Sequence, residues 1–551
     1  MNSSNKADFV ILAILDGWGL APDNRGNAIT QADTPNINRF WLSCPHSQLT
    51  ASGQAVGLPR GEEGSTETGH LNLGAGRIIY QELERINLSI ADGTFFDNKI
   101  LLASFNHIKK YNSNLHLMGL IGAGWVHSNI EHLFALIRLA KIQNINKVYL
   151  HLFTDGRDSP PTSALTYINM INDVIKREKL GKIASIMGRY WAMDRDKRWE
   201  RTEKAYLALT KGEGAYVDSA ESAIKSSYQL GKTDEFIEPA LILDKKNKKV
   251  ITVKDNDSII FFNFRIDRPR QLSKAFLLEN FTQEDVSWEY DPHSIKYEKT
   301  HLSTNGNNRN IFNRGKPLKN LYFVMMTEYS KQLVNAGAKV AFPPEVVTTP
   351  LGQVISLSGF RQLRIAESEK ERFVTFYFNG LREEAFEKEE RIIIPSPNVE
   401  TYDLKPEMSA LEITEQMIKK MKDKQYKLFV INYANPDMLG HTGNIGAAIK
   451  ACEIVDKCIG KLANIVLATN GVLIITSDHG NAEDMIDLEN NQIETEHSTN
   501  PVPFIAVAKK FIGKTVTLQS GILADVAPTI LGLLNLPVPG DFTGRDLLAT
   551  V

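Results

Sequence analysis

The sequence predicts an α/β protein in which a second α/β domain is inserted into the first. At 551 residues the chain is too long for one ordinary core. Three apolar, β-branched runs each stop just before an Asp-bearing motif, which is typical of strands buried on both faces of a parallel sheet. The runs are residues 9–15, 427–431 and 471–475. Because the first run lies near one end of the chain and the others near the opposite end, one sheet must draw on both ends.

The first run leads into Leu15-Asp16-Gly17-Trp18-Gly19. In open α/β sheets ligands bind beyond the carboxyl ends of the strands, which is where Asp16 is expected to lie. A single Asp after a strand often does no more than start a turn. Three such motifs that each carry His or Gly beside the Asp favour a functional edge of the sheet.

A Gly-rich segment, residues 57–70, comes next and leads into an expected helix. The N-terminus of a helix presents backbone N–H groups to an anion. A hydroxyl at its tip, on Ser65 or Thr66, can attack phosphorus once a metal ion has deprotonated it. The alternative is that this segment only caps the helix, and the two interpretations are compatible.

The sequence pattern changes over residues 81–315, where apolar helical stretches alternate with short Arg-rich motifs. We interpret 81–315 as the inserted domain, so that 1–80 and 316–551 together form the metal-binding domain. Hinges are expected near Tyr80–Arg85 and Asn313–Leu321. The polar stretch Lys299–Lys319 is interpreted as the return linker or a surface insertion.

Two groups of Asp and His from the ends of the chain suit divalent metals, because carboxylate and neutral imidazole are both good ligands for them. Asp437 and His441 have the i, i+4 spacing that places both on one face of a helix. A pair of metal ions about 3.5–4 Å apart is common in phosphoryl transfer. The expected ligands of one ion are Asp437, His441 and His497, and those of the other are Asp16, Asp478 and His479.

The amino-acid composition bears on which classes of binding partner the protein has. The balance of 63 basic against 65 acidic residues gives no electrostatic case for nucleic acid or an anionic membrane. Three Cys without zinc spacing argue against a disulfide framework and suit a reducing compartment. The run 9–15 is too short for a signal or transmembrane segment. We therefore expect a soluble, cytoplasmic protein that acts on a small molecule, and nothing demands more than a monomer.

Longer motifs carry a specific similarity. They are Gly64-Ser65-Thr66-Glu67-Thr68-Gly69-His70, Val126-His127-Ser128, Asp155-Gly156-Arg157-Asp158, Gly188-Arg189-Tyr190-Trp191-Ala192-Met193-Asp194-Arg195-Asp196, Phe262-Asn263-Phe264-Arg265-Ile266-Asp267-Arg268, and Ala366-Glu367-Ser368-Glu369-Lys370. With the metal motifs, they closely resemble the cofactor-independent (2,3-bisphosphoglycerate-independent) phosphoglycerate mutases of the alkaline phosphatase superfamily.

The resemblance implies an alkaline-phosphatase-like three-layer domain built from both chain ends, with an inserted phosphotransferase domain that binds the substrate. It implies interconversion of 3-phosphoglycerate and 2-phosphoglycerate in glycolysis and gluconeogenesis, through a phosphoenzyme and without 2,3-bisphosphoglycerate. Two divalent ions are expected, Mn²⁺ foremost and Mg²⁺ as the alternative. By position, the nucleophile joins the metal site of Asp16, Asp478 and His479.

The resemblance also implies roles for single residues. Lys370 matches the family lysine beside the reacting phosphate, where its charge would stabilise developing negative oxygen. Asp158 matches the residue that shuttles a proton between the glycerate hydroxyls, and His127 one that contacts substrate. Arg suits bidentate recognition of a carboxylate. The Arg residues expected to hold the glycerate are Arg157, Arg189, Arg195, Arg265 and Arg268.

The chain departs from the family pattern in three places, one of which is the stretch around residues 280–318, which is longer than expected for the family. Most members carry Asn-Ser where this chain has Ser65-Thr66, so the usual serine nucleophile aligns with Thr66, and Ser65 is the rival one residue away. Ala123-Gly124-Trp125 also replaces a more acidic, Gly-rich sequence. Two other functions stay open: a phosphomonoesterase or different phosphomutase on the same catalytic domain, and a non-enzymatic binding protein.

Overall fold

The computed structural model describes residues 6–244, 249–279 and 311–551 and divides into two compact units. The first unit comprises the described residues up to Glu84 together with Glu345–Val551, and the second is Arg85–Pro344. Each unit is built on a mainly parallel sheet with helices, so the predicted α/β class, with a discontinuous first unit, is confirmed.

The sheet of the first unit contains the three predicted strands as close neighbours. They are β1 (Val10–Leu15), β13 (Tyr426–Tyr433) and β14 (Val472–Thr476), and β1 pairs in parallel with both of the others. The full order is β12-β11-β13-β1-β14-β15-β2-β16, where the remaining strands are β12 (Glu389–Ile394), β11 (Arg361–Glu367), β15 (Val502–Val507), β2 (His46–Thr50) and β16 (Gly521–Ile522). Only β15 runs antiparallel to its neighbours.

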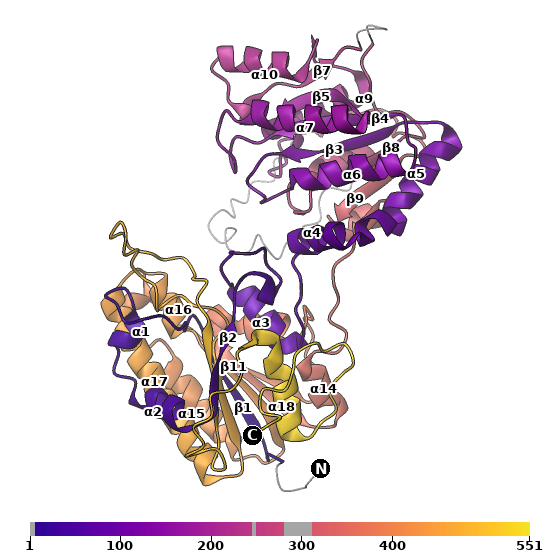
Figure 1. Cartoon of the computed structure of the whole chain (residues 1–551). Coiled ribbons are helices and arrows are strands. Elements are labelled where there is room, and N and C mark those ends of the chain that lie inside the picture. Colours follow the sequence, from indigo (N-terminus) through magenta and orange to yellow (C-terminus); the bar gives the residue numbers. More distant parts are fainter. Residues whose placement is uncertain (1–5, 245–248, 280–310) are drawn as a thin grey trace. The chain divides into compact units, whose positions relative to one another are not determined.

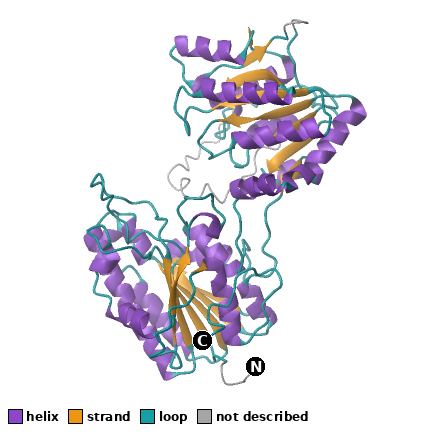
Figure 2. Cartoon of the chain, in the orientation of Figure 1, coloured by secondary structure: helices purple, strands orange, loops and turns teal. Residues whose placement is uncertain are grey.

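Both faces of this sheet are buried, as the continuous apolar runs predict. Alternate residues of β1 enter different cores: Val10, Leu12 and Ile14 on one face, and Ile11, Ala13 and Leu15 on the other. The first face packs against α3 (Thr66–Ala75), α14 (Leu351–Leu357) and α18 (Val526–Leu534). The second packs against α2 (Pro35–Ser43), α15 (Ala410–Met421) and α17 (Ile445–Ala468). Figures 1 and 2 show the resulting three layers.

The second unit has its own sheet, in the order β10-β9-β8-β3-β4-β5-β7-β6. Its strands are β3 (Leu115–Ile121), β4 (Val148–Thr154), β5 (Lys182–Gly188), β6 (Ala215–Val217), β7 (Ala240–Ile242), β8 (Ser258–Phe261), β9 (Tyr322–Thr327) and β10 (Lys339–Phe342). Helices α9 (Trp199–Lys211) and α11 (Pro269–Leu277) pack on one face. Helices α5 (Lys99–Tyr111), α6 (Ile130–Ile142) and α7 (Ala164–Glu178) cover the other (Figure 1).

Six further α-helices belong to the described residues. They are α1 (Ala28–Gln31), α4 (Glu82–Asp92), α8 (Arg189–Ala192), α10 (Ala220–Gln229), α13 (Lys331–Asn335) and α16 (Asn435–Gly440). Among the described residues, no helix has both the length and the apolar character needed to cross a membrane.

The return boundary differs from the one that the sequence predicts. The first crossing lies between Glu84 and Arg85, but the second lies at Pro344, well beyond the predicted residue 316. The reason is that β9 and β10 add to the sheet of the second unit beside β8. The predicted linker Lys299–Lys319 lies largely outside the described residues.

Candidate active site

Four adjacent parallel strands of the first unit end at the same edge of the sheet. The order β11-β13-β1-β14 puts their carboxyl ends side by side, and Leu15 is paired with Tyr433 at the last residue of both strands. Asp16 follows β1, and Asp437 lies on α16 just after β13. The segment after β14 carries Asp478 and His479, and Lys370 ends the 3₁₀ helix η4 (Ser368–Lys370) after β11. Strand order therefore brings together residues that are far apart in the sequence.

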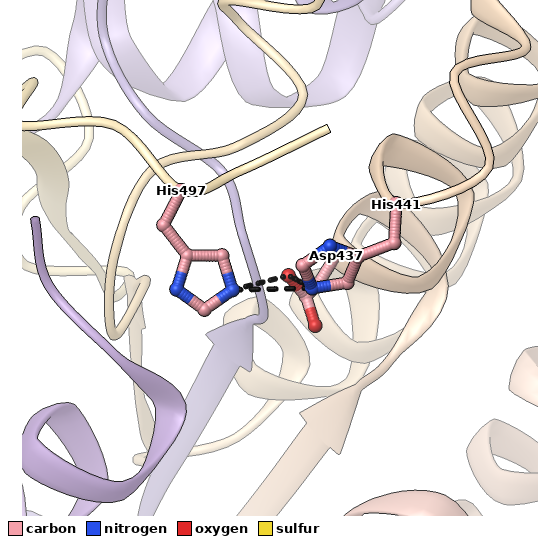
Figure 3. Close-up of side chains that lie close together, drawn as sticks. All are labelled: Asp437, His441 and His497. Atoms are coloured by element: carbon pink, nitrogen blue, oxygen red, sulfur yellow. Dashed lines mark hydrogen bonds and ion pairs between the residues drawn. The ribbon is translucent and has the colours of Figure 1, made fainter. Parts of the chain in front are cut away.

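Asp437, His441 and His497 form the first candidate metal cluster. His441 Nε2 lies 3.2 Å from Asp437 Oδ1, and His497 Nε2 lies 3.3 Å from the same oxygen. The two imidazole Nε2 atoms are 3.2 Å apart. Figure 3 shows both rings directed at the carboxylate of Asp437. The i, i+4 spacing read from the sequence thus places Asp437 and His441 together.

The second predicted set gathers around His479. Its Nε2 lies 3.5 Å from Asp16 Oδ1, 3.5 Å from Asp478 Oδ2 and 2.9 Å from Thr66 Oγ1. All four side chains are buried. His479 Nε2 is also 4.0 Å from Asp437 Oδ1, so the two clusters adjoin.

The hydrogen bonds of the three imidazoles fit metal ligation. The Nδ1 atoms of His441, His497 and His479 contact the backbone carbonyl oxygens of Thr495, Gly64 and Gly480 at 2.7, 2.8 and 3.2 Å. A carbonyl can only accept, so each Nδ1 carries a proton and each Nε2 is the ring nitrogen directed at the carboxylates. A proton on Nε2 faces these oxygens in the absence of a metal ion, and a divalent cation bound between them would replace that proton. Metal-bound His is commonly oriented in this way.

Ser65 and Thr66 have different surroundings. Ser65 is the N-cap of α3: its Oγ accepts a hydrogen bond from Thr68 N at 3.2 Å and lies 3.0 Å from Thr68 Oγ1. Thr66 is buried in the first turn, with Oγ1 2.9 Å from His479 Nε2. The capping role and the nucleophile role therefore fall on adjacent residues, and the geometry favours Thr66 over Ser65 as the hydroxyl at the metal clusters.

Two glycines allow the loops to approach this closely. Gly17 has φ of +73°, and a Cβ there would lie 2.7 Å from the Cα of Asp437. A Cβ on Gly69 would lie 2.5 Å from the carbonyl oxygen of Asp478. Helix α3 can therefore carry Thr66 up to the end of β14 only because Gly69 has no side chain.

Lys370 is a buried cation at the meeting point of the two clusters. Its Nζ donates to Asp16 Oδ1 at 2.7 Å, to Asp437 Oδ2 at 2.6 Å and to Thr66 Oγ1 at 3.2 Å. Burial alone would lower the pKa of Lys370, but Asp16, Asp437 and Asp478 outweigh burial and hold that pKa above its usual value. Lys370 is thus a permanent positive charge within hydrogen-bond distance of the candidate nucleophile.

The neighbouring carboxylates also raise the pKa of His479. Burial lowers the pKa of His479, but Asp478, Asp16 and Asp437 raise it to about 10 in the absence of a metal ion. Despite burial, the pKa values of Asp437 and Asp478 lie well below their usual range, because Lys370 and the histidines are close. The edge of the sheet is therefore a buried region of negative potential that attracts cations.

Three polar residues of this site were not singled out as site residues from the sequence. Asn432 Nδ2, on β13, donates to Asp16 Oδ2 at 2.6 Å, and Asn481 Nδ2 donates to Asp437 Oδ1 at 3.0 Å. Glu483 is fully buried and accepts hydrogen bonds from several loops of the site. The sequence offers one signal for these residues, which is Asn432 inside an apolar strand, but an Asn at that position does not indicate a specific chemistry.

The second unit has a comparable cluster at the carboxyl ends of its own strands. His127 and Asp158 follow β3 and β4, and Arg189 begins α8 directly after β5. His127 Nε2 lies 3.7 Å from Asp158 Oδ2, and Arg189 Nη1 donates to the carboxylates of Asp155 and Asp158. Burial, together with Arg189, Arg265 and Arg268 and against the opposing effect of Asp267, lowers the pKa of His127 to about 3, so the imidazole is neutral near pH 7.

The other four predicted Arg residues divide into three groups. Arg195 and Arg265 contact the carboxylate of Asp267, at 2.7 and 3.2 Å. Arg268 is half-buried, its Nη1 donates to Met193 O at 3.2 Å, its Nε has no hydrogen-bond partner, and burial lowers the pKa of Arg268 to about 10. Arg157 is more than half exposed (55%) and lies 3.9 Å from Glu235 instead of contacting the cluster.

The atypical loop beside His127 is mostly exposed and approaches the Asp158 segment at Gly124. A Cβ on Gly124 would lie 2.3 Å from the carbonyl oxygen of Asp158, so the loop runs directly over the Asp158 segment. Trp125 adopts a φ of 48° and is 54% exposed. The residues that depart from the family pattern are thus exposed at Ala123 and Trp125, whereas His127 is buried.

Comparisons with known proteins agree on one family. The family model described as BPG-independent PGAM N-terminus matches residues 86–331. The chain is 50% identical over 541 residues to the 2,3-bisphosphoglycerate-independent phosphoglycerate mutase of Chloroflexus aggregans, with 98% of each chain covered. It is 46% identical over 539 residues to the protein of the same name from Moorella thermoacetica, again with 98% of each chain covered.

A solved structure is similar over nearly the whole chain. It is a phosphoglycerate mutase of Leishmania mexicana, crystallised at low cobalt concentration. The TM-score is 0.56 at 27% sequence identity, with 99% of this chain and 98% of that chain covered.

Proposed function

The chain belongs to the 2,3-bisphosphoglycerate-independent phosphoglycerate mutases, which are isomerases, and on that premise we propose that it interconverts 3-phosphoglycerate and 2-phosphoglycerate through a phosphoenzyme on Thr66. One observation carries this proposal: the Thr66 hydroxyl lies within 3.2 Å of both His479 Nε2 and Lys370 Nζ, next to three overlapping groups of Asp and His that could each hold a metal ion.

Two divalent ions fit the donor set, held by Asp437, His441 and His497 and by Asp16, Asp478, His479 and Thr66. When bound, such ions neutralise phosphoryl oxygens and lower the pKa of a hydroxyl. The Asp/His chemistry suits Mn²⁺ or Mg²⁺, and we propose Mn²⁺ as the working ion.

The residues of the first unit carry out phosphoryl transfer. Thr66 Oγ1 forms a bond to phosphorus as the bond from phosphorus to the glycerate oxygen breaks. Lys370 stabilises the negative charge on the transferring oxygens, and the N-terminus of α3 presents backbone N–H groups to the same anion. In the second half of the reaction the phosphoryl group returns from Thr66 to the other hydroxyl of the glycerate.

The cluster of the second unit supplies what a glycerate needs. Arg268 has a buried Nε without a partner, which suits a substrate carboxylate. Arg189, Arg195 and Arg265 add positive charge, whereas Arg157 is assigned here on its match to the family alone. Asp158 is held by Arg189 and faces neutral His127. We propose that Asp158 moves the proton between the two glycerate hydroxyls while His127 contacts the substrate.

Membership of this family also leads to a proposal for the pathway, the cellular compartment and the oligomeric state. We propose that the protein acts as a monomer in glycolysis and gluconeogenesis, in the cytoplasm. In support of a reducing compartment, Cys44, Cys452 and Cys458 are all buried and free.

The test is formation of 2-phosphoglycerate from 3-phosphoglycerate by purified protein, without 2,3-bisphosphoglycerate, with added Mn²⁺ and after chelation. Turnover that requires the metal and disappears in Thr66→Ala supports the proposal. Phosphate release faster than isomerisation would favour a phosphomonoesterase instead. A folded, Mn²⁺-loaded protein that performs neither reaction would leave only a binding role.

A further inference from the structure

Glu483 is a buried carboxylate that no step of the reaction uses. Its side chain has no exposed surface. Oε2 accepts from the backbone N–H groups of Gly19 at 3.0 Å and of Asn481 at 2.8 Å. Oε1 accepts from the Ser498 hydroxyl and from Asn500 Nδ2, the latter at 3.1 Å. One carboxylate thus satisfies donors from three segments of the chain that lie far apart in the sequence.

Each of the three segments carries candidate ligands. Gly19 lies in the loop of Asp16, and Asn481 lies in the loop of His479. Ser498 directly follows His497. The fit is tight, because a Cβ on Gly19 would lie 2.2 Å from Glu483 Cδ, so the loop can wrap the carboxylate only with glycine there.

The two metal clusters depend on Glu483 to different degrees. Asn481, whose N–H is fixed by Glu483, donates from Nδ2 to Asp437 Oδ1 at 3.0 Å. The Ser498 hydroxyl, also bound to Glu483, adjoins His497 in the chain. Two of the three ligands in the cluster of Asp437, His441 and His497 are therefore oriented through Glu483.

The other cluster has supports of its own. Asp16 accepts from Asn432 Nδ2 at 2.6 Å, and Asp478 Oδ2 lies 3.1 Å from His70 Nδ1. Asp478 Oδ1 also accepts from His479 N at 3.1 Å. None of these contacts involves Glu483, so Asp16 and Asp478 keep their own partners even though Glu483 also accepts from Gly19 and Asn481 in the neighbouring loops.

We propose that Glu483 is a positioning residue that sets the affinity of the Asp437–His441–His497 cluster for a divalent cation selectively, by fixing the loops of Asn481 and Ser498. The inference rests on the proposed metal centre. Glu483 touches neither substrate nor metal ion in this account, and it acts through the two residues it holds.

The test is stepwise binding of Mn²⁺ to metal-free protein, followed by calorimetry, for wild type, Glu483→Gln and Ser498→Ala. In Glu483→Gln an NH₂ group replaces one carboxylate oxygen, so that two of the four donors lose their acceptor and face another donor instead. Loss of such an outer partner weakens metal binding by about 10- to 100-fold. We expect one of two binding steps to weaken by that factor while the other changes little. Ser498→Ala removes a single donor and should weaken the same step less.

Asp484→Asn is the matched control, because it removes an exposed negative charge from the next residue and keeps Glu483 with its four donors. It should leave both steps as in wild type. Thermal unfolding in EDTA identifies any variant that fails to fold, and in that case Ser498→Ala decides. The proposal also predicts that excess Mn²⁺ restores kcat in Glu483→Gln, which loss of a catalytic group would not allow.

Two results would overturn the inference while leaving the proposed function intact: unchanged affinity at both steps, or equal weakening of both. Wild-type protein that binds no Mn²⁺ at all would refute the proposed metal centre, and the role of Glu483 with it.

Discussion

Replacing Lys370 by Met should destabilise the metal-free protein much more than the Mn²⁺-loaded protein. The Nζ atom lies 2.7 Å from Asp16 Oδ1 and 2.6 Å from Asp437 Oδ2, and the ammonium is buried. Each attraction amounts to about 6 kcal/mol at an effective dielectric constant of about 20, but desolvation of the buried ions offsets most of it. Removing one partner of a buried ion pair typically costs about 3–5 kcal/mol, because the other charge is left uncompensated.

Bound divalent ions change that balance, since they compensate the same carboxylates. We therefore expect Lys370→Met to lower the free energy of unfolding by about 3–5 kcal/mol in EDTA and by less than half as much with saturating Mn²⁺. Urea unfolding of wild type and variant in both conditions measures the difference. Lys461→Met, which removes an exposed lysine from α17, should change stability by no more than about 0.5 kcal/mol in either condition. An equal loss with and without metal would refute the idea that Lys370 and the metal ions share these carboxylates.

Three further predictions follow from single contacts. Ser65→Ala should lower the free energy of unfolding by about 1 kcal/mol, because the N-cap of α3 is lost, and should retain mutase turnover. Lost turnover with unchanged stability would contradict the assignment of Ser65 as the cap. Burial raises the pKa of Glu367 from 4.5 to about 7, against the hydrogen bond from Ser409 N. The native state therefore holds a proton that the unfolded chain releases, and stability is lost as pH rises through this range. Chemical denaturation should therefore show that Glu367→Gln raises the free energy of unfolding by about 1–3 kcal/mol at pH 8 and changes it little below pH 4.5. The reverse order would show that the carboxyl is not protonated. Finally, Arg268→Met should lower kcat/KM for 3-phosphoglycerate by about 10- to 100-fold in steady-state assays, the value of a hydrogen bond to a charged group; an unchanged ratio would exclude contact with substrate.

The sheet of the first unit was readable from the sequence because strands buried on both faces leave continuous apolar runs. The runs at 9–15, 427–431 and 471–475 correspond to β1, β13 and β14; Asp16 follows β1 directly, and Asp478 follows β14 after Ser477. The candidate metal clusters were predictable for a related reason, since Asp and His beside strand ends combine an unusual position with a specific chemistry.

Other features depend on pairing, which the sequence does not display. Strands β9 and β10 resemble any apolar run, and only their pairing beside β8 assigns them to the second unit. Asn432 and Glu483 are common residue types whose importance lies in which loops they join. The choice between Ser65 and Thr66 likewise needed the cap geometry, because both hydroxyls stand at the start of the same helix.

The central claim is that the phosphoryl group passes through Thr66. The most direct measurement is to mix Mn²⁺-loaded protein with 3-phosphoglycerate, quench it with acid during turnover, and locate any covalent phosphate by mass spectrometry of the peptide that contains Ser65 and Thr66. The account predicts phosphate on Thr66 in wild type and in Ser65→Ala, and none in Thr66→Ala. Phosphate on Ser65, or isomerisation in Thr66→Ala at the wild-type rate, would contradict it.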